Sequence, residues 1–189
     1  MKQNNNFQFV IHRDNFLSKT QCDNIIKMFD DNKSSNSELV GEYKGSLLNK
    51  NVRDAKEIIF EDDYIKNKIK MVLELANLSI YKYNIQELED VKLLKYNIGG
   101  KYQWHTDVGS KETSTRKLTA IVQLSDEQDY EGGDLEFGIT DELGENNYVA
   151  TKKQGSIIVF PSFLSHRIIP ITKGTRYSLL TWMNGDSFV

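Results

Sequence analysis

The chain has 189 residues, 39% hydrophobic and 27% charged, values typical of a soluble globular protein with one domain. Its formal net charge of −3 and sequence pI of about 5.7 argue against a nucleic-acid backbone as the main partner. There is no apolar run near the roughly 20 residues of a membrane span, no secretory signal pattern at the amino terminus and a single cysteine, Cys22, so we expect a cytoplasmic protein without an intrachain disulfide.

The front of the chain, about residues 14–78, is expected to contain two supporting helices. Ser18 fits the N-cap of the first helix, because its hydroxyl can accept from the backbone N–H of Gln21, whose side chain can bond the N-cap backbone in return. The apolar residues that follow at helical spacing, and that should be buried, are Cys22, Ile25, Ile26 and Phe29.

Residues 31–50 are polar and contain glycine, so we expect a long loop there, followed by an extended segment at 52–60. A second helix is expected to begin near Asp62, because a carboxylate is favoured at the positive end of the helix dipole. The expected apolar stripe of this helix consists of Ile65, Ile69, Val72, Leu73 and Ala76.

From about residue 79 the hydrophobic period changes from that of a helix to that of a strand. Turn residues such as those at 98–100 and 131–133 separate the short apolar runs. Many short strands divided by glycine-containing turns are typical of an antiparallel sandwich or barrel, here over about residues 79–185. The expected strands are 79–83, 90–97, 102–108, 116–124, 134–138, 147–151, 155–160, 166–169 and 175–182.

Two of the three histidines stand where they could bind a metal. An extended backbone places His105 and Asp107 on the same face of their strand, because side chains alternate. His166 follows an apolar strand and a turn that contains Pro161, so it would project from a strand end. Two imidazoles and one carboxylate on one side of a metal leave about three positions open, an arrangement typical of non-haem Fe(II).

Other interpretations of these residues stay open at this point. Three ligands and a water also form a catalytic zinc site, so a zinc hydrolase is one alternative. A barrel that binds a metal or a small anion without catalysis is another. A single histidine most often only packs or forms hydrogen bonds, and this is how we interpret His12.

Arg176 is one of five arginines among 24 basic residues, and it lies in a strand-like run at 175–182. It would share one strand face with Ser178, Leu180 and Trp182. If that face points inward, a cation enters an apolar cavity, which is costly unless an anion meets it. Arginine can bind a carboxylate through two parallel hydrogen bonds, and Ser178 could donate a third. The alternative is that this face is exposed and Arg176 forms a surface ion pair. A metal triad followed about ten residues later by an arginine that anchors a carboxylate favours iron over zinc.

The second half of the chain contains an ordered series of motifs at residues 96–107, 116–119, 129–135, 155–162, 166–171 and 174–178. This series resembles the prolyl-4-hydroxylase-like Fe(II)- and 2-oxoglutarate-dependent dioxygenases. Similarity is greatest to the bacterial PKHD-type hydroxylases. The strong motifs cover about residues 94–185, and the first helix matches more loosely.

The resemblance implies an α+β, mainly β fold: a double-stranded β-helix (jelly-roll, cupin-like) buttressed by N-terminal helices, in one oxygenase domain over residues 1–189. It implies that Arg176 binds the distal carboxylate of 2-oxoglutarate and that Tyr96 hydrogen-bonds the same group. Some animal relatives carry a further tyrosine that contacts the co-substrate; this chain has Gln123 there, so that contact stays open. The implied iron ligands are His105, Asp107 and His166.

The reaction that the resemblance implies is hydroxylation of an unactivated C–H bond, with dioxygen as the oxidant and release of succinate and carbon dioxide. Ascorbate could serve as a reductant. The first expectation for the substrate is a prolyl residue in a peptide or protein, and the alternative is a free amino acid or small metabolite. We expect recognition in the loops at 31–50, 109–115 and 140–147, since polar loops beside a barrel mouth commonly carry it.

Overall fold

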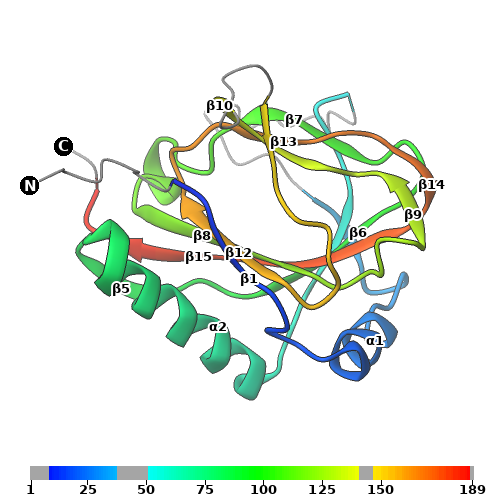
Figure 1. The fold of residues 1–189 in the computed structure, drawn as a ribbon, viewed down its shortest axis with the longest axis horizontal. Helices are drawn as coiled ribbons and strands as arrows, with labels where there is room; N and C mark the ends of the chain where they lie inside the picture. The colour runs from blue at the N-terminus through cyan, green and yellow to red at the C-terminus, as the bar shows by residue number, and fades with distance from the viewer. Residues whose placement is uncertain (1–8, 38–50, 141–146, 188–189) are drawn as a thin grey trace, which may run out of the picture.

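A computed structural model describes residues 9–37, 51–140 and 147–187 of the chain. Figure 1 shows two layers of β-structure, with two helices beneath the lower layer. Within the described residues, no helix has the length and apolar character needed to cross a membrane. Side chains can therefore pack in two places, between the two layers and between the lower layer and the helices.

The larger sheet has eight strands in the order β1-β12-β8-β15-β6-β4-β2, and β5 also pairs with β15. Every strand pair in it is antiparallel. Its strands are β1 (Ile11–Arg13), β2 (Ser35–Asn36), β4 (Lys56–Ile59), β5 (Ile85–Leu88), β6 (Lys92–Tyr96), β8 (Arg116–Gln123), β12 (Ile157–Pro161) and β15 (Arg176–Gly185).

The smaller sheet has five antiparallel strands in the order β11-β10-β13-β7-β3, and a separate two-stranded ribbon joins β14 to β9. Its strands are β3 (Arg53–Asp54), β7 (Lys101–His105), β10 (Leu135–Thr140), β11 (Asn147–Val149) and β13 (His166–Ile168), and those of the ribbon are β9 (Tyr130–Gly132) and β14 (Ile171–Gly174).

Side chains of the larger sheet divide between two apolar cores, because successive residues of a strand point to opposite faces. In β8, Ala120 and Val122 belong to the core on the helix side, whereas Ile121 belongs to the core between the sheets. The residues that meet between the two sheets include Leu94, Phe160 and Leu180 from the larger one and Leu135, Phe137 and Ile168 from the smaller one. The space between the sheets is therefore walled by inward-facing strand residues.

Both helices begin where the sequence predicts. In α1 (Lys19–Lys27) both hydrogen bonds of the predicted capping box are present, between Ser18 and Gln21. In α2 (Asp63–Ala76) the Asp62 side chain accepts from the backbone N–H of Ile65 at 3.0 Å. Each helix packs its apolar side on the outer face of the larger sheet. The buried residues of the α2 stripe are Ile65, Ile69, Leu73 and Ala76, with Val72 partly buried beside them.

The strand predicted at 79–83 is wrong. Helix α2 instead continues into a π-helical turn, η1 (Asn77–Tyr81), and ends where Lys82 adopts a φ of 60°. Ile80 and Tyr81 are apolar, as the residues of a buried strand would be, but they belong to a helical turn and pack into the core under the larger sheet. The Tyr81 hydroxyl also donates to the Val159 carbonyl at 3.2 Å, so tertiary contacts decide the local conformation here.

Short strands were missed by the sequence interpretation: β1, β2, β5, β9 and β14 have only two to four residues each. An alternation of polar and apolar residues cannot be recognised over so few positions. The part of the expected 31–50 loop that is described contains β2, and the rest, like 141–146 of the third loop, lies outside the described residues. The 109–115 loop contains a 3-10 turn, η2 (Lys111–Thr113).

Candidate active site

His105 and His166 are placed side by side by neighbouring strands of the smaller sheet. His105 ends β7 and His166 begins β13, and the two residues are direct register partners across that antiparallel pair. Their ring centroids lie 4.1 Å apart. Two histidines that are distant in sequence thus face the space between the sheets together, as the metal hypothesis requires.

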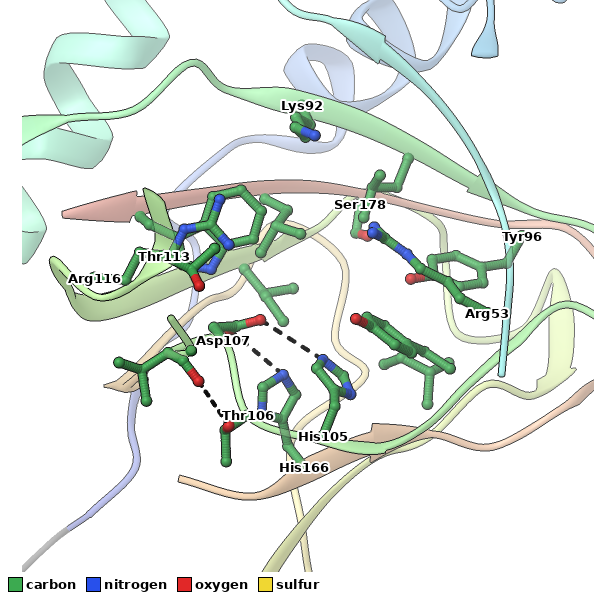
Figure 2. A pocket seen from close by; sticks show the side chains of 18 of the residues that line it. Arg53, Lys92, Tyr96, His105, Thr106, Asp107, Thr113, Arg116, His166 and Ser178 are labelled. Atoms are coloured by element: carbon green, nitrogen blue, oxygen red, sulfur yellow. Dashed lines mark hydrogen bonds and ion pairs between the residues drawn. The ribbon is translucent and has the colours of Figure 1, made fainter. Parts of the chain in front are cut away.

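Asp107 lies two residues beyond His105, where the chain leaves β7. Its Oδ1 is 3.6 Å from His105 Nε2 and its Oδ2 is 3.6 Å from His166 Nε2. Dashed lines in Figure 2 mark these two contacts. The backbone N–H of Asp107 donates to the Ser162 carbonyl at 2.8 Å, which fixes this turn. One atom from each of the three side chains lies within 4.8 Å of the other two, so a single cation could contact all three.

Hydrogen bonds select the ring nitrogen that each histidine turns toward this point. Nδ1 of His105 is 2.7 Å from the Gln103 carbonyl oxygen, and Nδ1 of His166 is 2.9 Å from the Leu164 carbonyl oxygen. A carbonyl oxygen only accepts, so each Nδ1 carries the proton and each Nε2 keeps its lone pair. Burial lowers the pKa of His166 to about 4, with Asp107 opposing the shift. At neutral pH this imidazole is neutral, as metal binding requires.

Asp107 is kept ionised by its surroundings. Burial alone would raise its pKa, but the attraction of the His166 and His105 rings when they are protonated, together with a hydrogen bond from Thr119, outweighs burial and brings the pKa well below its ordinary value. The carboxylate is therefore already ionised at neutral pH, where His166 is neutral. Thr119 lies on β8 in the opposite sheet, is fully buried, and donates from Oγ1 to Asp107 Oδ2 at 2.7 Å. Its role was missed in the sequence, because nothing in the spacing shows that these two strands face each other.

Arg176 begins β15 and points into the space between the sheets with 1% of its surface exposed. The inward face predicted for this strand is confirmed, since Arg176, Ser178, Leu180 and Trp182 are all buried and line one cavity. Among the described residues no carboxylate forms an ion pair with the guanidinium, and its Nε has no hydrogen-bond partner. A buried cation without an internal anion is the situation in which a ligand carboxylate is expected.

Three neighbours hold the guanidinium in place. Nη2 donates to Gln123 Oε1 at 2.9 Å, and Nη1 lies 3.4 Å from Ser178 Oγ. Tyr96, the register partner of Arg176 on β6, is buried with its ring centroid 5.4 Å from the guanidinium carbon. Gln123 thus contacts the arginine from the position that the sequence left open.

The triad and Arg176 line the same open cavity; the empty space in it, counted together with the solvent at its mouth, is about 740 Å³. In Figure 2, Arg116 and Tyr96 lie at opposite sides of this cavity with the triad between them. The wall combines polar side chains with an apolar part formed by Leu94, Ile121, Ile168 and Leu180. Apolar side chains disfavour water beside the point where a metal and an organic acid would meet.

The family model of the 2OG-Fe(II) oxygenase superfamily matches residues 91–184, about half of the chain. A PKHD-type hydroxylase of Synechococcus sp. (strain CC9902) is 31% identical over 99 residues, which are 52% of this chain and 43% of that protein. Among solved structures, a Trichoplax adhaerens prolyl hydroxylase in complex with a hypoxia inducible factor peptide fragment aligns with a TM-score of 0.77 and 17% identity, over 94% of this chain and 84% of that one. A Pseudomonas putida prolyl-4-hydroxylase aligns with a TM-score of 0.69 and 15% identity, over 95% and 94%.

The chain spans between 43% and 65% of the length of three PKHD-type relatives that it matches. At these identities the structural likeness defines the fold, which is that of the prolyl hydroxylases, a double-stranded β-helix. The segment matched by the family model contains the two histidines, the aspartate and the buried arginine described above. The chain belongs to the 2OG-Fe(II) oxygenase superfamily.

Proposed function

We propose that this protein is an Fe(II)- and 2-oxoglutarate-dependent dioxygenase that hydroxylates an unactivated C–H bond, with a prolyl residue in a peptide or protein as its substrate. The observation that carries the proposal is that one cavity contains three converging ligand atoms and a buried arginine without an internal carboxylate partner. The reaction would consume dioxygen and 2-oxoglutarate and release succinate and carbon dioxide, with ascorbate as a possible reductant of the iron.

His105, Asp107 and His166 would hold the iron. Two imidazole nitrogens with free lone pairs and one ionised carboxylate form the donor set that suits non-haem Fe(II) with open coordination positions. When bound, Fe(II) would supply the activation of dioxygen. The protein's own residues fix the two Nε2 atoms, orient the carboxylate through Thr119, and keep water from the apolar wall.

Arg176 would bind the distal carboxylate of 2-oxoglutarate, leaving the keto-acid end to face the iron. Gln123 and Ser178 engage one N–H each, so further N–H groups of the guanidinium remain for a carboxylate. Ser178 and Tyr96 would complete this end of the cavity. An anion here would remove the cost of a cation buried at 1% exposure.

A prolyl substrate is supported by the likeness to prolyl hydroxylases, one of which was solved with a peptide fragment. A free amino acid is the second candidate, because Lys92 and Arg116 also line the cavity and could bind its carboxylate. A zinc hydrolase would leave Arg176 without a role, and a barrel that binds without catalysis would be expected to lack one of the metal ligands, whereas all three are present.

The test is succinate release by purified protein supplied with Fe(II), 2-oxoglutarate and a library of proline-containing peptides and free amino acids. We expect release that depends on both additions and on a member of the library. His105→Ala and Asp107→Ala should abolish it, because each removes one of three ligands. Turnover at the wild-type rate by either variant, after removal of adventitious metal, would refute the assignment.

A further inference from the structure

Three cations besides Arg176 line the cavity. They are Arg53, Lys92 and Arg116, whereas Asp107 is the one acidic residue among the described residues of the lining. Under the proposed function, Arg176 serves 2-oxoglutarate and Asp107 serves the iron. Of the other three cations, Lys92 and Arg116 lie near Trp182, whereas Arg53 lies over the ring of Tyr102.

Lys92 lies on the inner face of β6, four residues along from Tyr96. Tyr96 is beside Arg176, whereas the Lys92 ammonium lies 5.9 Å from the ring centroid of Trp182. Lys92 Nζ donates to Glu57 Oε1 at 2.6 Å, and the side chain is 24% exposed. An ammonium has three N–H donors and Glu57 takes one of them, so the others can meet a ligand or water in the cavity.

Glu57 lies behind Lys92 on β4 and is not part of the cavity lining. Its other carboxylate oxygen is 3.5 Å from Arg53 Nη2. Burial would raise the pKa of Glu57, but the hydrogen bond from Lys92 and the charges of Lys92 and Arg53 outweigh burial and lower it. The carboxylate thus stays ionised and positions the ammonium from the rear without occupying the cavity.

Arg116 is held in the same manner. Its Nε and Nη2 donate to the two carboxylate oxygens of Glu89 at 2.8 and 2.7 Å, and Glu89 also lies outside the lining. The guanidinium carbon is 3.6 Å from the centroid of the Trp182 ring. Both cations therefore lie near one buried aromatic ring, are each paired with a carboxylate outside the lining, and line the cavity with N–H groups left over.

We propose, on the basis of the function proposed above, that the molecule which the enzyme hydroxylates carries a carboxylate, and that this carboxylate binds to Lys92 and Arg116 beside Trp182. Lys92 and Arg116 keep N–H groups beyond those that Glu57 and Glu89 accept, and in a cavity closed by the substrate a ligand carboxylate would accept from them in place of water. The carboxylate has two possible sources, an acidic side chain next to the target residue of a peptide or the α-carboxylate of a free amino acid.

The test is equilibrium binding by calorimetry, without turnover, to protein loaded with Mn(II) and 2-oxoglutarate. One pair of probes is a proline-containing decapeptide with glutamates on both sides of the proline and its glutamine counterpart; the other pair is L-proline and L-prolinamide. The acid of at least one pair should bind about tenfold more tightly than its amide at low salt, with the preference shrinking as salt is added. The pair that discriminates identifies the source of the carboxylate. Equal affinities in both pairs, or no binding by either acid, would overturn the proposal.

Two variants with opposite expected effects on the preference for the acid distinguish loss of recognition from damage to the fold. Lys92→Met should remove most of the preference for the acid, whereas Glu57→Gln, which frees the ammonium from its anchor, should strengthen it. Lys173→Met is the matched control, because Lys173 is an exposed lysine paired with Glu131 at 3.0 Å and is not part of the lining. A full preference in Lys92→Met would refute the role of Lys92.

The same titrations distinguish this proposal from the proposed function. If 2-oxoglutarate binds in the presence of Mn(II), and loses affinity in an Arg176 variant, while acids and amides bind equally, only the carboxylate site is refuted. If 2-oxoglutarate itself does not bind, the proposed function fails.

Discussion

Asp107 links the two sheets at the candidate metal centre through a side-chain hydrogen bond. It belongs to the chain leaving β7 of the smaller sheet, but its carboxylate accepts a hydrogen bond from Thr119 of the larger sheet. The orientation of a metal ligand commonly depends on such a partner. The distance between the sheets is therefore coupled to the geometry of the carboxylate.

Thr119→Val should weaken metal binding by about 10- to 100-fold, because it keeps the side-chain shape and removes the hydrogen bond to Asp107. The affinity can be measured by competition with a chelator, using Fe(II) without oxygen or Mn(II). Thr181→Val is the matched control: Thr181 is a buried threonine on β15 whose hydroxyl donates to the Glu89 carbonyl at 2.9 Å. Equal metal affinities in the two variants would contradict the role given to Thr119.

Arg176→Gln should raise the KM for 2-oxoglutarate by about 30-fold or more and change kcat much less. Loss of a charge-assisted contact to a buried carboxylate costs about 2–5 kcal/mol, and every 1.4 kcal/mol is tenfold. Steady-state succinate release at varied 2-oxoglutarate measures both constants. Arg167→Gln provides the control, since Arg167 neighbours His166 but pairs with Glu136 and is not part of the cavity lining. An unchanged KM in Arg176→Gln would place the co-substrate elsewhere.

At the residue scale, the sequence predicted those site residues that are polar or charged and whose placement follows from the pattern of a single strand. His105 and Asp107 share a strand face by simple alternation, and Arg176 stands out as a cation in an apolar run. Thr119, Gln123 and Lys92 could not be found in this way. Their roles depend on which inward-facing residues of separate strands meet, and spacing along one strand does not contain that information.

Helix α2 illustrates how much the sheet depends on its support. Leu73 is fully buried at the centre of the core on the helix side, whereas Leu75, two residues on, is 53% exposed. Leu73→Ala should lower the free energy of unfolding by about 2–5 kcal/mol, the usual cost of a large-to-small change in a core. Leu75→Ala should change it by no more than about 0.5 kcal/mol. Urea denaturation followed by circular dichroism compares them, and equal losses would mean that the helix is not packed as described.

At the element scale, the sequence predicted features that depend on neighbouring residues, and it did not predict features that depend on contacts between distant segments. The N-caps at Ser18 and Asp62 were predictable because a cap and its helix lie within four residues of each other. The strand predicted over η1 was wrong, since Tyr81 is buried there and its hydroxyl bonds the carbonyl oxygens of Phe9 and of Val159 in β12, contacts that the local sequence does not reveal. Short strands such as β5 exist because a longer neighbour pairs with them, here β15.

At the scale of the whole molecule, the larger sheet separates support from chemistry. Its outer face packs against α1 and α2, and its inner face contributes Arg176 and Lys92 to the cavity and the Thr119 hydroxyl that bonds Asp107. Periodicity alone predicted an antiparallel sandwich or barrel with helical support. The double-stranded β-helix was named through family resemblance, because the strand order of a sheet is set by pairings that no single segment encodes.

Cys22 reports on the integrity of this assembly. It is fully buried, and burial, reinforced by the charge of Asp23, raises the pKa of its thiol to about 11. Because the thiolate is the reactive form and the folded state disfavours it, iodoacetamide at pH 8 should leave the native protein unmodified and add one group in concentrated urea. Intact mass spectrometry distinguishes the two. Rapid modification of the native protein would show that the interface between α1 and the larger sheet opens readily.

The convergence of His105, Asp107 and His166 on one iron, with Arg176 holding the co-substrate, is tested most directly by anaerobic titration of 2-oxoglutarate into Fe(II)-loaded protein followed by visible absorbance. The wild-type protein should develop a weak charge-transfer band that saturates at one 2-oxoglutarate per chain, and Asp107→Ala should develop none. A wild-type protein that stays colourless while folded and loaded with iron, or a band of full strength in Asp107→Ala, would contradict this assignment.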